Sequence, residues 1–241
     1  MKTYKTRGIV LHTIKYGDTS MVAYILTDIL GRQNYLVQGV KSSKGKGNKA
    51  ALLQPMFLLE FEGINSGHSQ MDRMKDVRLS QPLQSIPFDI RKSTISLFMA
   101  EVLYRLIKEV EPNSPLFDFV NDSVLALDTM ESGISNFHLW FLVQLSAFLG
   151  FYPANQYSQN DIFDIIEGAF SPIIPQHALI INRENSHLLG ELMNCSVFDL
   201  PLIELARSQR SDFLNSLLGY FSYHLDSINK VQSLNILREV F

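Results

Sequence analysis

Hydrophobic and polar positions alternate with the two-residue period of β-strands through the first third of the chain. In the stretch 56–62, for example, Phe57, Leu59 and Phe61 alternate with Leu58, Glu60 and Glu62. Other stretches are rich in β-branched and aromatic residues and are separated by turn residues. The predicted strands are 6–16, 19–27, 33–40, 56–62 and 69–79. Five short strands joined by glycine-containing turns fit a small closed barrel.

From Pro87 onward the apolar positions recur every three or four residues, which is the period of an amphipathic helix. Pro112 is expected to end the first helix, and Ser114, followed by a proline, is expected to cap the second. Gly150 closes a third helix that is apolar on nearly all sides. The predicted helices are 95–110, 114–130, 137–149 and 214–225, before a short terminal helix. Residues 151–200 mix prolines with strand-like pieces and fit no single element type.

These patterns predict an α+β protein with two domains. The first, over 1–80, is a five-stranded barrel such as the oligonucleotide-binding (OB) fold, although an SH3-like barrel fits the pattern almost as well. The second, over 81–241, is an all-α helical domain with an insert at about 151–200. At 241 residues with 46% apolar content, the chain is long enough to bury two modest cores.

Charge is divided unequally between the two halves. Residues 1–81 carry 12 lysines and arginines against 6 acidic residues, whereas 82–241 carry 9 against 18. Opposite charges of this size indicate that the two domains meet different partners. The longest apolar stretch, 137–152, is too short and too polar to cross a bilayer, and the N-terminus lacks the apolar core of a signal peptide. The single Cys195 cannot form an internal disulfide, which favours a cytoplasmic location.

A lysine-rich segment, 41–49, contains four lysines, two glycines and no acidic residue. Lysine is a flexible point charge suited to sequence-independent contact with phosphates. The segment lacks the glycine spacing and the hydroxyl residue of a nucleotide-binding P-loop. Its lysines are Lys41, Lys44, Lys46 and Lys49. We expect these lysines to contact a DNA backbone, the alternative being an ordinary solvated surface loop.

Other residues of the first domain could extend this DNA-binding surface. The basic candidates are Lys5, Arg7, Arg32, Arg73, Lys75 and Arg78. The aromatic candidates for stacking on bases are Tyr16, Tyr24, Tyr35 and Phe57, although most aromatic residues of strands belong to the core.

Catalytic and metal-binding motifs are absent from the sequence. It contains no His-Glu-x-x-His, no Gly-x-Ser-x-Gly and no paired Cys-x-x-Cys, so no catalytic residue is nominated. His177, His187 and Cys195 match no common zinc spacing, and an isolated cysteine more often packs than reacts. A nuclease would need clustered carboxylates, for which the first domain offers Asp18, Asp28, Glu60, Glu62, Asp72 and Asp76.

Several segments resemble the RecO family of bacterial recombination mediators. In the first domain these are 7–20 (RGIVLHTIKYGDTS), Gly31-Arg32, Val40-Lys41 and 51–55 (ALLQP). In the second they are 149–153 (LGFYP), 163–168 (FDIIEG) with Phe170, and 218–225 (LGYFSYHL). The resemblance covers nearly the whole chain, and the run 7–20 is its most specific part.

The resemblance implies an OB-fold barrel, a helical domain and a role in recombinational repair without an enzymatic activity. Proteins of this family bind single- and double-stranded DNA, anneal complementary strands, partner with RecR and dock the acidic C-terminal tail of single-stranded DNA-binding protein so that RecA can load. Such a protein would act at the nucleoid. A docking site for the tail would combine an apolar pocket with positive charge. The helical spacing offers Arg91, Lys92, Arg105 and Lys108 for it.

One departure from the family concerns zinc. Many proteins of the RecO family carry four cysteines in a zinc module after the segment that corresponds to 150–153, and here the region 151–200 retains only Cys195. We therefore expect no structural zinc and no other cofactor, with packing in place of the metal. A different class of function also remains open, a protein-interaction scaffold whose basic barrel binds an acidic protein instead of DNA.

Overall fold

The chain folds into two compact units, Met1–Thr129 and Met130–Phe241, and each is described on its own. The computed structural model describes residues 2–40, 49–65, 67, 71–108 and 111–241. Within this part of the chain, no helix is long and apolar enough to span a membrane.

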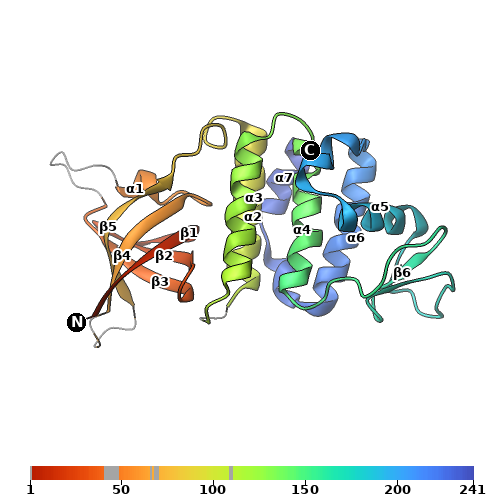
Figure 1. Cartoon of the computed structure of the whole chain (residues 1–241), viewed down its shortest axis with the longest axis horizontal. Helices are drawn as coiled ribbons and strands as arrows, with labels where there is room; N and C mark the ends of the chain where they lie inside the picture. The colour runs from red at the N-terminus through yellow and green to blue at the C-terminus, as the bar shows by residue number, and fades with distance from the viewer. Residues whose placement is uncertain (1, 41–48, 66, 68–70, 109–110) are drawn as a thin grey trace. The chain divides into compact units, whose positions relative to one another are not determined.

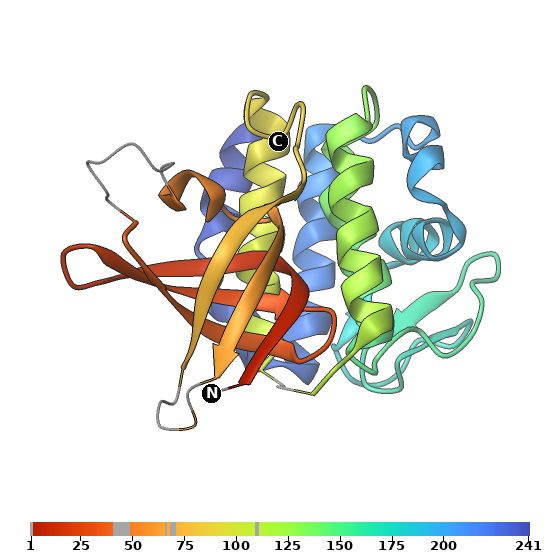
Figure 2. The same ribbon diagram turned by 60° about the vertical axis from the view of Figure 1, so that its left-hand side comes forward.

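The first unit begins with a closed five-stranded barrel (Figures 1 and 2). Its strands are β1 (Lys2–Tyr16), β2 (Ser20–Thr27), β3 (Gly31–Gln38), β4 (Leu58–Asn65) and β5 (Asp72–Gln81), with the short helix α1 (Lys49–Leu52) between β3 and β4. The order around the barrel is β1-β2-β3-β5-β4, and β4 returns to pair with β1. All neighbours are antiparallel except β3 and β5, which are parallel. The predicted strands and the OB-fold are confirmed, with bounds that differ by a few residues.

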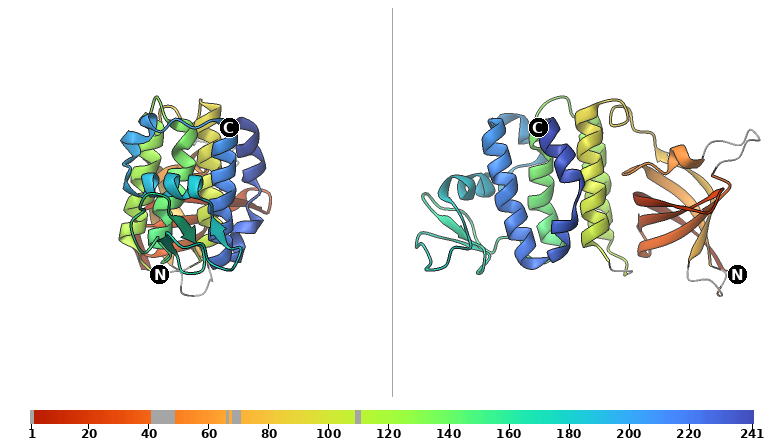
Figure 3. Two further views of the ribbon diagram at one scale, coloured as in Figure 1. Left: turned by 90° about the vertical axis from the view of Figure 1, so that its right-hand side faces the viewer. Right: turned by 180° about the vertical axis from the view of Figure 1, so that it is seen from behind.

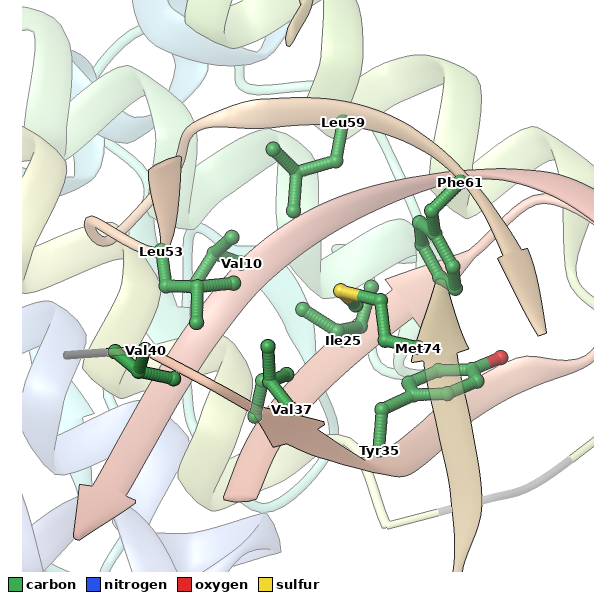
Figure 4. Close-up of a cluster of buried hydrophobic side chains, with 10 residues drawn as sticks. Val10, Ile25, Tyr35, Val37, Val40, Leu53, Leu59, Phe61 and Met74 are labelled. Atoms are coloured by element: carbon green, nitrogen blue, oxygen red, sulfur yellow. The ribbon is translucent and has the colours of Figure 1, made fainter. Parts of the chain in front are cut away.

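Alternate residues of the strands fill the barrel (Figure 4). Val10, Ile25, Tyr35 and Phe61 point toward one another, and each is at most 2% exposed. Close approach of the strands also requires glycine, because a Cβ on Gly63 would lie 2.3 Å from the ring of Tyr4. The strand alternation therefore places large apolar side chains in the barrel core, and Gly63 leaves room for the ring of Tyr4.

A polar contact fastens the barrel where β3 meets β5. Tyr35 pairs with Asp72 across these strands, and the hydroxyl of Tyr4 donates to Asp72 at 2.5 Å. The hydroxyls of Tyr4 and Tyr35 lie 3.1 Å apart. Burial, and then the neighbouring carboxylate, raise the pKa of Tyr4 well above its ordinary value, so the phenol stays protonated and can donate.

Two helices follow the barrel in the first unit, α2 (Ile90–Leu106) and α3 (Ser114–Thr129). The side chain of Asp89 caps α2 by accepting from the backbone N–H of Arg91 at 2.8 Å. The helix ends at Leu106, four residues before the predicted end, since Ile107 is extended. Arg32 of β3 donates to the carbonyl oxygens of Tyr104 and Ile107, which satisfies acceptors that a helix end leaves open.

A buried polar network joins the connection after β5 to α3. The carboxylate of Asp128 accepts from the backbone N–H groups of Gln84, Ser85 and Ile86 at 2.7–2.9 Å. Lys92 of α2 donates to the hydroxyl of Ser85 at 2.7 Å and to the carbonyl oxygen of Asp128 at 2.8 Å. This network fixes the connection against both helices.

The second unit is mainly helical. Its α-helices are α4 (Phe137–Phe148), α5 (Arg183–Asn194), α6 (Arg207–His224) and α7 (Ser233–Val240), and its 3-10 helices are η1 (Ile134–Asn136), η2 (Val197–Leu202) and η3 (Asp226–Lys230). Helix α4 runs beside α6 (Figure 3). Nine of the twelve α4 residues are buried, as its almost continuous apolar sequence predicts.

The region 151–200 contains a small sheet as well as helices. Strands β6 (Ile162–Asp164), β7 (Ala169–Ser171) and β8 (Ile180–Ile181) pair in the order β7-β6-β8, and the sheet packs against α5 (Figure 3). The side chain of Asn155 makes two hydrogen bonds, of 2.7 and 2.9 Å, with the backbone of Phe170. The hydroxyl of Ser186 bridges β6 and β8 in the same way.

Candidate nucleic-acid interface

A groove opens beside β5 because β3 and β5 separate after a short contact. The two strands pair only at Tyr35 with Asp72 and Leu36 with Arg73. The groove has a volume of about 770 Å³. It is lined by Leu36, Gln38, Lys49, Leu52, Ile64, Arg73, Met74, Lys75, Asp76 and Val77. We call this surface the β3–β5 groove.

Among the described residues, three cations and one anion line the β3–β5 groove. Lys49 donates to the backbone carbonyl of Gln38 at 3.3 Å. Because this acceptor is neutral, the bond does not compensate the positive charge of Lys49. Arg73 makes no ion pair with the residues that the structure describes, and Lys75 lies 3.4 Å from the carboxylate of Asp76. The groove therefore carries a net charge of about +2 above an apolar floor, which suits a phosphate backbone.

The lysine-rich segment is attached at the edge of this groove. Lys41, Lys44 and Lys46 lie outside the described residues, so the expectation for them is neither supported nor opposed. The flanking residues are placed: Gln38 and Lys49 both line the groove, and the backbone of Val40 is hydrogen-bonded to Thr19 at 2.9 Å. The described residues Gln38, three positions before the segment, and Lys49, its last residue, thus both line the β3–β5 groove.

The outer face of β1 and β4, with the end of β5, has a different charge pattern. Lys5 pairs in register with Glu62, and the guanidinium of Arg78 lies 3.0 Å from the carboxylate of Glu60. Both basic residues line a second groove, of about 390 Å³, with three acidic residues. This groove is weakly acidic and offers phosphate little attraction.

Arg7 and Arg32 are engaged inside the first unit. Arg7 pairs with Asp28 at 3.0 Å and lies over the ring of Phe117, 5.1 Å from its centroid. Arg32 is half-buried against the ring of Tyr104, whose carbonyl it also binds. Burial lowers the pKa of Arg32, as expected for a cation removed from water. Its hydrogen bonds leave it little freedom to reach DNA.

The aromatic candidates divide between the core and the surface. Tyr35 is fully buried and offers no face to a base, and Phe57 is partly buried against the barrel core. Tyr24 is half-buried between the rings of His12 and Tyr104. Tyr16 is 53% exposed at the end of β1. It pairs with Ser20 of β2, and Ser20 pairs with Gln38 of β3, which lines the β3–β5 groove. Tyr16 therefore lies two strands away from Gln38 in the same row of paired residues.

The four basic candidates for partner binding also differ in accessibility. Lys92 is only 5% exposed, because it serves the network around Asp128. Arg91 is exposed but pairs with Asp89 at 3.0 Å, and Arg105 pairs with Glu101 at 3.3 Å. Lys108 is exposed beyond the end of α2.

Sequence reasoning missed an arginine pocket in the second unit. Arg207, Arg210 and Arg238 surround a small pocket of about 40 Å³, with apolar walls that include Leu214 and Leu237. Their hydrogen bonds include those of Arg207 to the carbonyl of residue 238 at 2.7 Å, of Arg210 to the amide of residue 136 at 3.1 Å and of Arg238 to the amide of residue 215 at 2.6 Å. Arg210 also donates to a main-chain oxygen of Phe241 at 3.3 Å. These are three of the five basic residues in 130–241. Arg207 and Arg210 lie before the predicted helix 214–225, so no predicted element grouped them with Arg238.

The residues that could hold a metal are dispersed. The described part of the chain contains no group of three or more metal-binding side chains. His177 lies 3.2 Å from Asp164, while burial raises the pKa of Cys195 to about 11 and keeps the thiol protonated. Among the carboxylates considered for a nuclease, Asp28 and Glu60 are paired with arginines. Among the described residues, these side chains therefore form no group that could hold a metal, although Glu60, Glu62 and Asp76 line the second groove together.

Comparison with known proteins gives a consistent result over the whole chain. A family model described as Recombination protein O N terminal matches residues 1–83, and one described as Recombination protein O C terminal matches 87–233. A protein of Bacteroides fragilis named DNA repair protein RecO is 39% identical over 98% of both chains. Proteins of the same name from Phocaeicola vulgatus and Flavobacterium psychrophilum are 35% and 34% identical, again over 98% of each chain.

Proposed function

Since the chain belongs to the recombination protein O (RecO) family, we propose that it is a recombination mediator in DNA repair. It binds single- and double-stranded DNA and promotes the annealing of complementary strands. The observation that carries this proposal is the β3–β5 groove, where Lys49, Arg73 and Lys75 surround an apolar floor. The lysine-rich segment, attached at the groove edge, adds further positive charge.

Annealing requires no acid, base or nucleophile from the protein. Two DNA strands repel each other through their phosphates, and a basic groove lowers this repulsion while raising the local strand concentration. Base pairing then supplies the driving force. In this mechanism the barrel acts as an electrostatic platform, and the activity is not enzymatic.

The partners proposed for the chain are RecR and the acidic C-terminal tail of single-stranded DNA-binding protein, through which RecA is loaded. A tail site must combine apolar walls with positive charge. The arginine pocket of the second unit meets both requirements, whereas Arg91 and Arg105 on α2 are paired with carboxylates. We therefore place the tail at Arg207, Arg210 and Arg238.

Packing takes the place of zinc in the region 151–200. Phe163 is fully buried and meets the ring of Phe170 edge to face, 5.1 Å between centroids. Asn155 and Ser186 supply hydrogen bonds that tie the short strands together. Aromatic packing and buried hydrogen bonds of this kind stabilise a small sheet without a metal.

Fluorescence anisotropy with a labelled mixed-sequence oligonucleotide tests the proposed function. Binding of micromolar or tighter affinity that weakens steeply with salt is expected for single strands and duplexes. Annealing of two complementary labelled strands should then accelerate with the protein. Failure to bind at low salt would instead favour the scaffold whose basic barrel binds an acidic protein.

A further inference from the structure

One residue of the β3–β5 groove has an unusual backbone conformation. Asp76 has a φ of 49°, in the left-handed region that residues other than glycine seldom adopt, although asparagine and aspartate adopt it more often than the rest. The cause is a β-bulge: Glu62 pairs with Lys75 and Glu60 with Arg78, so two residues of β5 face Phe61 of β4. An extra side chain is therefore presented at this point of the strand.

The bulge changes which side chains of β5 reach the surface. Before it the strand alternates regularly, with Met74 buried and Lys75 exposed. At the bulge two successive residues, Lys75 and Asp76, are exposed, with side-chain exposures of 59% and 66%. Asp76 and its neighbour Val77 line both the β3–β5 groove and the second groove, so the bulge lies where the two grooves meet.

Within the part of the chain that the structure describes, Asp76 is the single acidic residue that lines the β3–β5 groove. Its carboxylate lies 3.4 Å from the ammonium of Lys75, within the distance of an ion pair. A phosphate entering the groove must compete with this carboxylate for Lys75 and is also repelled by it. The bulge thus places a negative charge at the site proposed to bind the negatively charged DNA backbone.

From this geometry we infer that Asp76 limits the affinity of the groove for DNA, so that a bound strand can be released to the next component. The inference rests on the proposed function. Lys49, Arg73 and Lys75 attract the backbone, and Asp76 offsets part of that attraction at the same site. A strand held by fully uncompensated cations would dissociate more slowly, which hinders annealing turnover and transfer.

Asp76→Asn is the informative variant, because asparagine tolerates the left-handed conformation while the negative charge is removed. Anisotropy titrations of the full chain with a labelled mixed-sequence single strand should show about three- to tenfold tighter binding at low salt. The plot of log K against log salt should steepen by up to about 0.7, because Lys75 becomes free to contact one more phosphate. The melting temperature should remain close to that of the wild type.

Asp122→Asn serves as the matched control, since it makes the same change of net charge at an exposed position on α3. It should leave both affinity and salt slope unchanged. An effect of backbone strain alone would move the melting temperature without changing the salt slope.

Three results are decisive. Tighter binding and a steeper slope with Asp76→Asn alone support the inference. An unchanged affinity for Asp76→Asn, in a wild type whose binding is salt-dependent, overturns it and leaves the proposed function standing. A wild type without salt-dependent binding overturns both.

Discussion

The guanidinium of Arg78 in β5 lies 3.0 Å from the carboxylate of Glu60 in the adjacent strand β4. Five residues earlier on β5, Arg73 lines the β3–β5 groove and has no ion-pair partner in the part of the chain that the structure describes. Two arginines of one strand are therefore in opposite electrostatic situations. Cross-strand pairing compensates the first, whereas the second, at the end of the short contact between β3 and β5, faces no carboxylate among the described residues and is available for phosphate.

The lysine-rich segment should contribute to DNA binding in proportion to its phosphate contacts. Replacing Lys41, Lys44, Lys46 and Lys49 with alanine should weaken binding equally on all sequences. Each lost contact removes a released counterion, so the log–log salt slope on duplex DNA should flatten by up to about 3.6 units. Salt titrations of the wild type and the quadruple variant measure this, and an unchanged slope would show that the segment does not touch DNA.

Tyr16 should contribute to binding of single strands by stacking, since it is exposed in the cross-strand row that leads to the β3–β5 groove. Tyr16→Ala should weaken single-strand binding by about 1 kcal/mol, or roughly fivefold, without altering the salt slope. Tyr16→Phe keeps the ring and should bind as the wild type does. Equal binding by the alanine and phenylalanine variants would show that the ring of residue 16 does not stack on DNA bases.

Arg32 should be required for stability rather than for DNA binding. Arg32→Ala removes the donors to the end of α2 and should lower the free energy of unfolding by about 2 kcal/mol, as measured by urea denaturation. Arg32→Lys keeps the charge but loses the fork of donors, and should be nearly as destabilising. Under conditions below its unfolding transition, where it is still folded, each variant should bind DNA normally, and a selective loss of DNA affinity in a folded Arg32→Ala would contradict this role.

Asp128 should make stability depend on pH. Burial opposes the charge of Asp128, but the backbone N–H groups of Gln84, Ile86 and Ser85, with the Ser85 hydroxyl, outweigh it and hold its pKa below the ordinary value. The ionised form is thus favoured in the folded state, and its contribution is complete above the unfolded pKa of about 3.9. It is lost as the pH falls through the lower folded value.

The matching variant is Asp128→Asn, which keeps the shape of the side chain but not its charge. At neutral pH it should be less stable than the wild type by about 2 kcal/mol. The difference between the two proteins should persist down to about pH 5 and shrink at lower pH. Urea denaturation across this range provides the measurement, and a difference that stays constant to pH 2 would show that the ionised carboxylate is not the cause.

The chain should fold without zinc. Elemental analysis of protein purified without chelators should find well under one zinc per chain, and EDTA should leave the melting temperature unchanged. One tightly bound zinc per chain would contradict the proposal that packing stabilises the region 151–200.

The elements that sequence reasoning located are those long enough to show a period. The alternation around Phe57, Leu59 and Phe61 identified β4, and the three-to-four spacing from Ile95 identified α2. Strands β6, β7 and β8 have only two or three residues each, which is too few for a period to appear. Their pairing depends on side chains such as Asn155, whose partner is 15 residues away.

The candidate site was predictable in composition but not in detail. Excess positive charge in residues 1–81 indicated a polyanion-binding barrel, and three of the predicted residues, Lys49, Arg73 and Lys75, line one groove. Which lysines and arginines are already paired depends on strand register and on tertiary contacts. The burial of Lys92, for example, follows from Ser85 and Asp128, and no local pattern around Lys92 reveals it.

The most direct test of the account compares two variants from the same strand. Arg73→Ala/Lys75→Ala removes cations of the β3–β5 groove, whereas Arg78→Ala removes a cation already paired with Glu60. In salt titrations with a labelled single strand, the double variant should bind more weakly and its log–log slope should flatten by at least about 0.7, the contribution of Arg73, since Asp76 competes with phosphate for Lys75, while Arg78→Ala should keep the wild-type slope. Equal effects of the two, or no effect of the double variant, would contradict the assignment of the β3–β5 groove as the DNA-binding site.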